Sequence, residues 1–298
     1  MSGFRVFVHI ALFLATAVTT TIMGTLLAVD VPADDASGGV FALLQAIAAN
    51  PSYIASGIVF SFTLLVILAA HEFGHYFACR YYEIDASLPY FLPAPPPILI
   101  GTFGAFIRIR SPFPSRRALF DVGVAGPIAG FCFALPASVV GLLFASPSVA
   151  PSVEGGITFH DPLLFMAIQQ LFHLPEAIAW NPIYFAAWIG MFATGLNLIP
   201  VGQLDGGHAI AALVGQRGHR IVSRLFFAGV ATLAIVSVVR FGSPVWFLYV
   251  VLLALLAFRT HPPTLAEEHD IGNGRRLVAV IVALIFVLCF MPFPITMN

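Results

Sequence analysis

The stretch LLVILAAHEFGHYFACR, residues 64–80, places two histidines and a glutamate at the end of an unbroken apolar run. On a helix, His71 and His75 lie one turn apart on the same face, so both imidazoles can reach one ion, while Glu72 projects about 100° round the axis. This spacing is typical of a zinc-binding pair with an adjacent base. A charged side chain deep in a bilayer costs about 2.5–3.5 kcal/mol on insertion scales, so the triplet indicates a functional site.

Composition indicates that the surrounding chain is a membrane protein. Of its 298 residues, 59% are hydrophobic and 9% are charged, whereas soluble domains carry about 25% charged residues. The mean hydropathy is +0.97, which agrees with this assignment. The net charge of -1 gives no electrostatic reason to expect nucleic-acid binding.

Apolar runs recur along the chain at about the 20 residues that a spanning helix needs. We expect spans at 5–29, 53–79, 119–145, 182–200, 220–239, 244–258 and 277–291. The run 244–258 is short and begins at Pro244, so it is either a tilted span or a broken one. The predicted fold class is an all-α polytopic membrane protein with about six or seven transmembrane helices. The loops are too short to hold another domain, so we expect residues 1–298 to form a single integral membrane domain.

The charged residues predict the orientation of the chain in the membrane. All 13 basic residues are arginine, and with a cytoplasmic N-terminus every one except Arg240 falls on the cytoplasmic side. Apart from Arg240, the opposite side has no basic residue, and its loops contain Asp30, Asp34, Asp35, Glu154, Asp161 and Glu176. This is the positive-inside asymmetry. His71 lies nine residues before Arg80, roughly 13 Å along a helix, so we expect the site near the cytoplasmic face.

The segment between the second and third spans, 80–118, has a different pattern. Ile107 and Ile109 alternate with arginines, and a period of two indicates a strand. Glycines ahead of this stretch offer turn points, so we expect a small membrane-associated β-hairpin near 98–110. A strand at membrane depth has to be buried in protein or line a wet cavity.

Zinc held by two histidines needs a third protein ligand if one position is to stay open for water. Asp205 is the favoured candidate, because it directly follows a span in NLIPVGQLDGGH, residues 197–208. There Pro200 breaks the helix and two glycines let backbone approach closely. Asp121 begins a span on the same side and stays a candidate. The other interpretation of LDGG is a turn with a helix cap.

These motifs together resemble a known family. The chain has HEFGH in one span and, later, the pattern N-x-x-P-x-x-x-x-D-G, which begins at Asn197 and ends at Gly206. Both are signatures of the site-2 protease family of intramembrane zinc metalloproteases. The sequence DVGVAGPIAG also resembles a third segment of that family, and GTFGAFIRI looks like its membrane-associated hairpin.

The resemblance covers a core of about residues 53–214. The flanking spans, 5–29 and 220–291, are similar to the family only in hydrophobicity, and no PDZ domain is apparent.

The resemblance implies hydrolysis of peptide bonds within or near the transmembrane segments of membrane proteins, in the lipid bilayer. One zinc ion per chain would be held by His71, His75 and Asp205, and it would lower the pKa of its water from 15.7 to about 7. Glu72 would act as the general base. Asn197 would help to hold the substrate or its oxyanion.

Two further sets of residues are expected near the site. A substrate helix must unwind because its backbone hydrogen bonds protect it, and Phe106, Ile107 and Ile109 are expected to offer it a strand edge. His208, three residues after Asp205, is a candidate to support a ligand by a hydrogen bond. The remaining histidines have no partner spacing.

Two alternatives stay open at this point. One is a membrane HExxH protease whose third ligand is a glutamate, which is disfavoured because no glutamate lies in a suitable span on the expected side. The other is a non-catalytic scaffold or metal transporter. A structural zinc site tends to have four protein ligands, and a transporter needs polar residues along a whole path. Neither pattern is seen, and no pattern specifies an oligomeric state.

Overall fold

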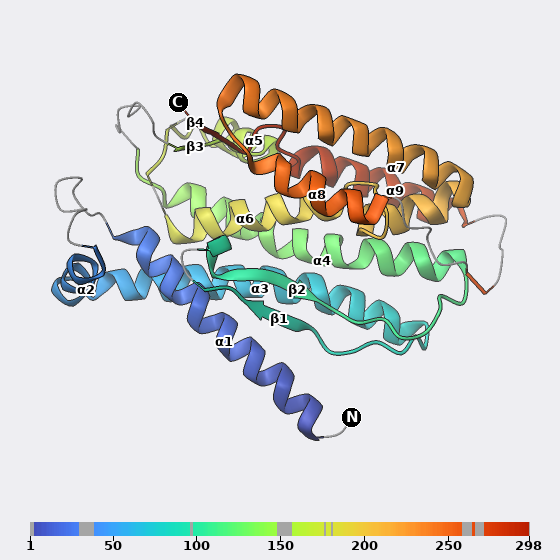
Figure 1. The fold of residues 1–298 in the computed structure, drawn as a ribbon, viewed down its shortest axis with the longest axis horizontal. Coiled ribbons are helices and arrows are strands. Elements are labelled where there is room, and N and C mark those ends of the chain that lie inside the picture. The colour runs from blue at the N-terminus through green and yellow to red at the C-terminus, as the bar shows by residue number, and fades with distance from the viewer. Residues whose placement is uncertain are drawn as a thin grey trace.

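The computed structural model describes residues 3–29, 39–95, 98–147, 157–175, 177–179, 181–257, 264–265 and 271–297. This part of the chain is mostly helical and carries two small antiparallel sheets (Figure 1). The helices are α1 (Gly3–Ala28), α2 (Gly39–Ala49), α3 (Ser52–Tyr81), α4 (Arg116–Leu143), α5 (Leu163–Leu171), α6 (Pro182–Asn197), α7 (Asp205–Phe241), α8 (Val245–Ala257) and α9 (Asn273–Cys289). The strands are β1 (Tyr90–Pro93), β2 (Thr102–Phe106), β3 (Ile157–Phe159) and β4 (Ile295–Met297).

Four helices of the described residues, α1, α3, α4 and α7, are long and apolar enough to cross a membrane. The spans expected at 182–200, 244–258 and 277–291 correspond to shorter helices of 16, 13 and 17 residues. The expected count of six or seven spans is therefore not confirmed, although the apolar runs are helical. Several of the charged residues that predict the orientation lie outside the described residues, as does residue 258; they are Asp30, Asp34, Asp35, Glu154, Glu176 and Arg259.

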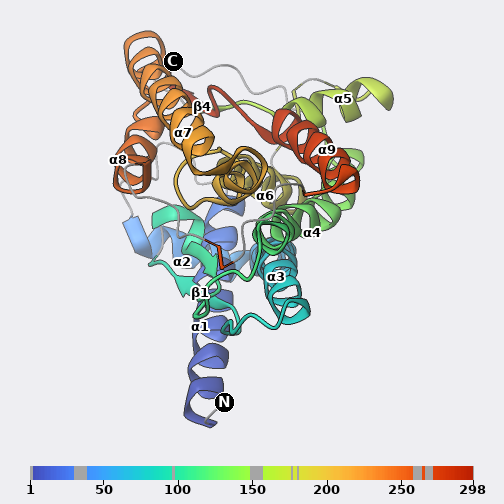
Figure 2. The same cartoon turned by 90° about the vertical axis from the view of Figure 1, so that its right-hand side faces the viewer.

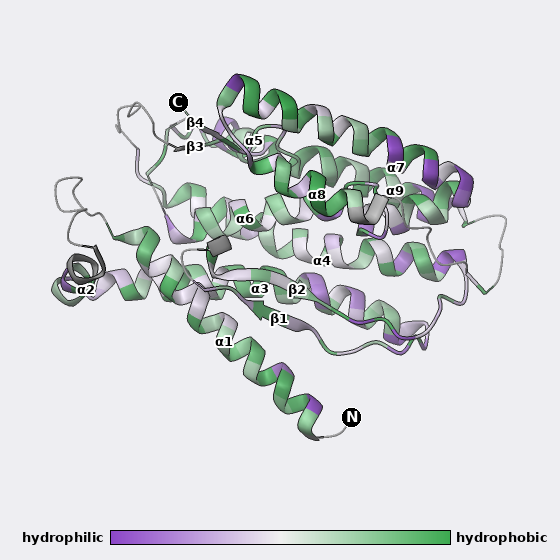
Figure 3. Cartoon of the chain, viewed as in Figure 1, coloured by the Kyte–Doolittle hydropathy of each residue, from purple (hydrophilic) through white to green (hydrophobic). Residues whose placement is uncertain are grey.

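Helix α6 lies at the centre of the molecule (Figure 2). It packs against α3, α4 and α9, and most of its side chains are buried, with Ala186, Ala187 and Met191 fully so. Hydrophobic residues cover most of each helix, whereas hydrophilic ones concentrate at the right-hand ends of α4, α7 and α9 in Figure 3. The arginine-rich ends of these three helices thus lie on one side of the molecule.

Helix α7 is divided at Gly215, where the backbone has φ 73° and ψ 178°. A straight helix would separate Asp205 from His219 by 14 residues, or about 21 Å. However, His219 Nε2 lies 3.0 Å from the carbonyl oxygen of Gly202, ahead of the helix. The chain therefore folds back at Gly215, and residues 205–214 form a short helix separate from the long apolar one.

The β-hairpin forms, with β2 inside the predicted range 98–110 and β1 before it. β1 pairs with β2 in antiparallel register, with Tyr90 opposite Phe106 and Leu92 opposite Gly104. The strand expected from the alternation at 106–110 is wrong in its bounds, because β2 ends at Phe106. Residues 107–110 continue as an extended segment with one isolated bridge, at Ile109. Alternation marks extended backbone, and extended backbone does not require a regular ladder.

Candidate metal centre

Helix α3 carries the two predicted histidine ligands and the glutamate into the protein interior. His71, Glu72 and His75 are each 7% exposed. The helix runs without interruption from Ser52 to Tyr81, so the spacing of four residues stacks the two imidazoles on one face. Their Nε2 atoms are 3.2 Å apart. The pair presents two nitrogen donors to the same point.

Asp205, the first residue of α7, completes the group. Its Oδ2 lies 3.1 Å from His71 Nε2 and its Oδ1 lies 3.3 Å from His75 Nε2. One donor atom from each of the three side chains lies within 4.8 Å of the other two. The structure thus brings Asp205, which is distant in sequence, to the histidine pair of α3, and the three residues are those predicted as one ligand set.

The donor chemistry of this group fits a zinc ion. The Val122 carbonyl lies 2.7 Å from His75 Nδ1, and because a carbonyl only accepts, Nδ1 carries the hydrogen and Nε2 keeps its lone pair for a metal. Two neutral imidazoles and one carboxylate form the three-ligand set that catalytic zinc sites use, with one position left for water or substrate.

A short turn positions Asp205. Asn197 ends α6, and its Nδ2 lies 3.3 Å from His71 Nε2. The chain then turns through residues 198–204 and returns to His71 at Asp205. A Cβ atom at Gly206 would lie 2.1 Å from the carbonyl oxygen of Leu198, so only glycine lets the turn close against α7. The cap of α7 is Leu204, without a side-chain hydrogen bond, so the cap interpretation of LDGG is not supported.

A cavity of about 200 Å³ opens beside Glu72. Its lining includes Phe103, Gly104 and Ala105 of β2, and it extends between α3, α6 and α8. The backbone of Ile107 is a hydrogen-bond partner of the Glu72 carboxylate. The hairpin therefore lies directly over the glutamate.

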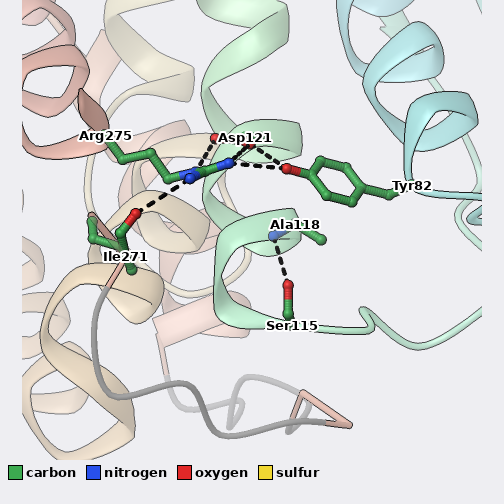
Figure 4. A network of polar contacts seen from close by, with 6 residues as sticks. All are labelled: Tyr82, Ser115, Ala118, Asp121, Ile271 and Arg275. Atoms are coloured by element: carbon green, nitrogen blue, oxygen red, sulfur yellow. Dashed lines mark hydrogen bonds and ion pairs between the residues drawn. The ribbon is translucent and has the colours of Figure 1, made fainter. Parts of the chain in front are cut away.

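Asp121, the other ligand candidate, is engaged elsewhere (Figure 4). Arg275 of α9 donates to it from Nη2 at 2.6 Å and from Nε at 2.8 Å. The Tyr82 hydroxyl, at the end of α3, also donates to its Oδ2. Burial raises the pKa of Tyr82, and the neighbouring Asp121 raises it further. No histidine of the described residues is a hydrogen-bond partner of Asp121 in this cluster.

The other predicted residues lie at or just after the end of β2 and in α7. Phe106 is exposed, while Ile107 and Ile109 are half-buried and follow the hairpin. The His208 ring packs 5.8 Å from that of Phe113, between ring centroids, and its support of a ligand stays a prediction. Sequence reasoning missed Tyr82 and Arg275, and it also missed His219 and Ser223, which contact the turn at 198–204. Each of these contacts joins residues far apart in sequence without a local pattern to mark them.

Comparison with known proteins gives a consistent result. The family model "Peptidase family M50" matches residues 59–240. "Probable zinc metalloprotease EGY2, chloroplastic" of Arabidopsis thaliana is 31% identical over 253 residues, which are 82% of this chain and 43% of the relative. "Probable zinc metalloprotease EGY1, chloroplastic" of Oryza sativa subsp. japonica is 29% identical over 252 residues, 80% of this chain and 41% of the relative. The chain thus spans less than half the length of these curated relatives.

Proposed function

The chain belongs to peptidase family M50, the site-2 protease family, and on that premise we propose that it is a zinc metalloprotease that cleaves transmembrane proteins within or near their membrane segments. The observation that carries the proposal is the convergence of His71, His75 and Asp205 beside Glu72 in a cavity. The names of these relatives describe zinc metalloproteases, which supports zinc as the metal.

We assign the chemistry to named side chains. His71, His75 and Asp205 would hold one zinc ion per chain, which supplies a Lewis acid and a water of lowered pKa when bound. Glu72 is not a ligand, so its carboxylate is available to take the proton from the attacking water and return it to the leaving amine. Asn197 directs an amide toward the same point and would donate to the developing oxyanion.

The hairpin is the proposed docking edge for an unwound substrate. The backbone N–H groups of Ser87 and Arg110 donate to Arg108 and Asp85, respectively, so residues 108 and 110 bond inward along the hairpin. Because alternate residues of a strand direct their backbone groups to opposite edges, Ile107 and Ile109 face the other way. That edge continues along β2, whose Phe103 and Ala105 line the cavity. A substrate strand added there would lie beside Glu72.

The alternatives receive less support. Besides Glu72, the one glutamate of the described residues is Glu83, which is exposed and follows α3, so a glutamate third ligand is not favoured. A closed structural zinc site would need a fourth protein ligand, and the metal-binding group of the described residues has three members. We also propose that the N-terminus and the arginine-rich helix ends face the cytoplasm, with the site near that face.

The direct test is a Glu72→Gln variant of the full chain in detergent or nanodiscs. Gln keeps the size of the side chain but cannot accept a proton, so cleavage of a transmembrane test substrate should fall by at least about 100-fold. Zinc content should stay equal to that of the wild type, because Glu72 is not a ligand. Glu83→Gln is the matched control and should cleave normally. Persistent cleavage by Glu72→Gln would rule out the mechanism.

A further inference from the structure

The turn at residues 198–204 controls two functional groups at once. Asn197 precedes it and Asp205 follows it, and their side chains lie 3.3 and 3.1 Å from the same atom, His71 Nε2. A shift of this turn would therefore change both distances together. The residues that hold this turn in place therefore also set the geometry of the metal centre.

Two side chains from the second half of α7 bind the backbone of this turn. His219 Nε2 donates to the carbonyl of Gly202 at 3.0 Å. Ser223 Oγ donates to the carbonyl of Pro200 at 3.2 Å and accepts from the N–H of Gly202 at 3.3 Å. The two side chains lie 3.2 Å apart, one helical turn from each other, and they are only 2% and 1% exposed.

The fold-back at Gly215 makes these contacts available. It returns residues 219–223 to the turn that precedes the same helix. At the other end of the short helix 205–214, Arg116 of α4 donates to the carbonyl of Ala212, with Nε at 2.9 Å. The last carbonyls of a helix lack partners within it, so this arginine caps the segment. The helix that begins with Asp205 is thus held at both ends.

We propose that His219 and Ser223 are positioning residues for the metal centre, because they fix the turn that places Asp205 and Asn197 against His71. They contact neither metal nor substrate. The inference rests on the proposed function in that Asp205 is taken as a ligand. Residues that orient metal ligands without binding the metal themselves typically contribute about 10- to 100-fold to metal affinity or activity.

The test compares His219→Ala, His219→Gln and Ser223→Ala in the full chain loaded with zinc. We expect His219→Ala to lose zinc to a chelator about tenfold faster than the wild type. Its kcat should fall by a similar factor while KM stays within about twofold, because the docking edge is unchanged. Gln offers an N–H donor at the same reach, so His219→Gln should recover most of both losses. Ser223→Ala should show a smaller effect in the same direction.

Ser237→Ala is the matched control, since its hydroxyl is fully buried on the same helix half and makes no hydrogen bond within the described residues. It lies 14 residues beyond Ser223, about 21 Å along the helix, and should leave zinc loss and kcat unchanged. Wild-type zinc retention in folded His219→Ala, equal losses in Ser237→Ala, or no recovery with Gln would each overturn the inference. If the wild type holds zinc but cleaves nothing, the proposed function fails while the zinc-loss comparison still decides the positioning role.

Discussion

At the scale of single residues, two glycines of α4 shape the metal centre. A Cβ atom at Gly126 would lie 2.1 Å from His75 Nε2, and one at Gly130 would lie 3.2 Å from His71 Cβ. Both glycines belong to the sequence DVGVAGPIAG, whose resemblance to a family segment suggested no physical role by itself. The geometry supplies the role, because the lack of a side chain at these two positions lets α4 pack close to the two histidines.

The ligand assignment leads to a prediction at this scale. Asp205→Ala should purify with little or no zinc, because two neutral imidazoles remain and the only anionic donor of the group is lost. Asp121→Ala should retain zinc at the wild-type level, since Asp121 bonds to Arg275 and Tyr82 instead. Metal analysis of both proteins by mass spectrometry measures this. The opposite pattern, with zinc kept in the first variant and lost in the second, would make the assignment wrong.

The predictable residues carry a local sequence pattern, and the unpredictable ones do not. His71 and His75 were predictable because helical spacing alone brings them together, and Asp205 was favoured because a proline and two glycines mark its turn. Arg275 meets Asp121 across 154 residues. No local pattern encodes such a contact, so it is seen only in the folded structure.

At the scale of elements, the hairpin shows what alternation in a sequence does and does not determine. The pattern at 106–110 correctly indicated extended backbone, but the paired strands are β1 and β2, and β2 ends where that pattern starts. The ladder depends on the partner strand, which has no alternation of its own in YFLP. The backbone of Ile107 is also already used by Glu72, so Ile109 offers the cleaner test of the edge.

We predict that Ile109→Pro lowers kcat/KM for a transmembrane substrate about tenfold, because proline removes a backbone donor from the docking edge. Ile109→Ala keeps that donor and should lose less than about threefold. Zinc content should be normal in both variants. Equal losses for Pro and Ala would indicate side-chain packing, and no loss in either would remove this part of the edge from the mechanism.

The fold-back of α7 gives a second prediction for elements. Gly215 has a combination of φ and ψ that is almost confined to glycine, so Gly215→Ala should destabilise the protein by about 1–3 kcal/mol although its Cβ would have open space. Gly229→Ala, in the second half of α7 and equally open, should stabilise it by up to about 1 kcal/mol. Thermal unfolding in one detergent compares them. Similar unfolding temperatures would mean that Gly215 is not a strained hinge.

At the scale of the whole molecule, the site lies between the hairpin, the helices α3 and α6, and the helix α8. The hairpin covers one side of the cavity, α3 and α6 form its base, and α8 closes it with Tyr249, Leu252 and Leu253. Three of the five α6 residues that line it are small, Gly190, Ala193 and Thr194, and the other two are Leu196 and Asn197. A cavity of about 150 Å³ accommodates benzene, so the 200 Å³ here is large enough for one large apolar side chain.

This arrangement predicts which substrates are cleaved. Ala193→Phe should fill the cavity, so cleavage should be kept for substrates with Gly or Ala next to the scissile bond and fall at least about tenfold for those with Leu or Phe there. Zinc content should not change, because no ligand moves. Ala69→Phe is the matched control, since Ala69 lines a separate apolar groove formed by α3 and α4. If both variants lowered cleavage of all substrates equally, the cavity would not be the selecting pocket, and the small α6 residues would serve packing alone.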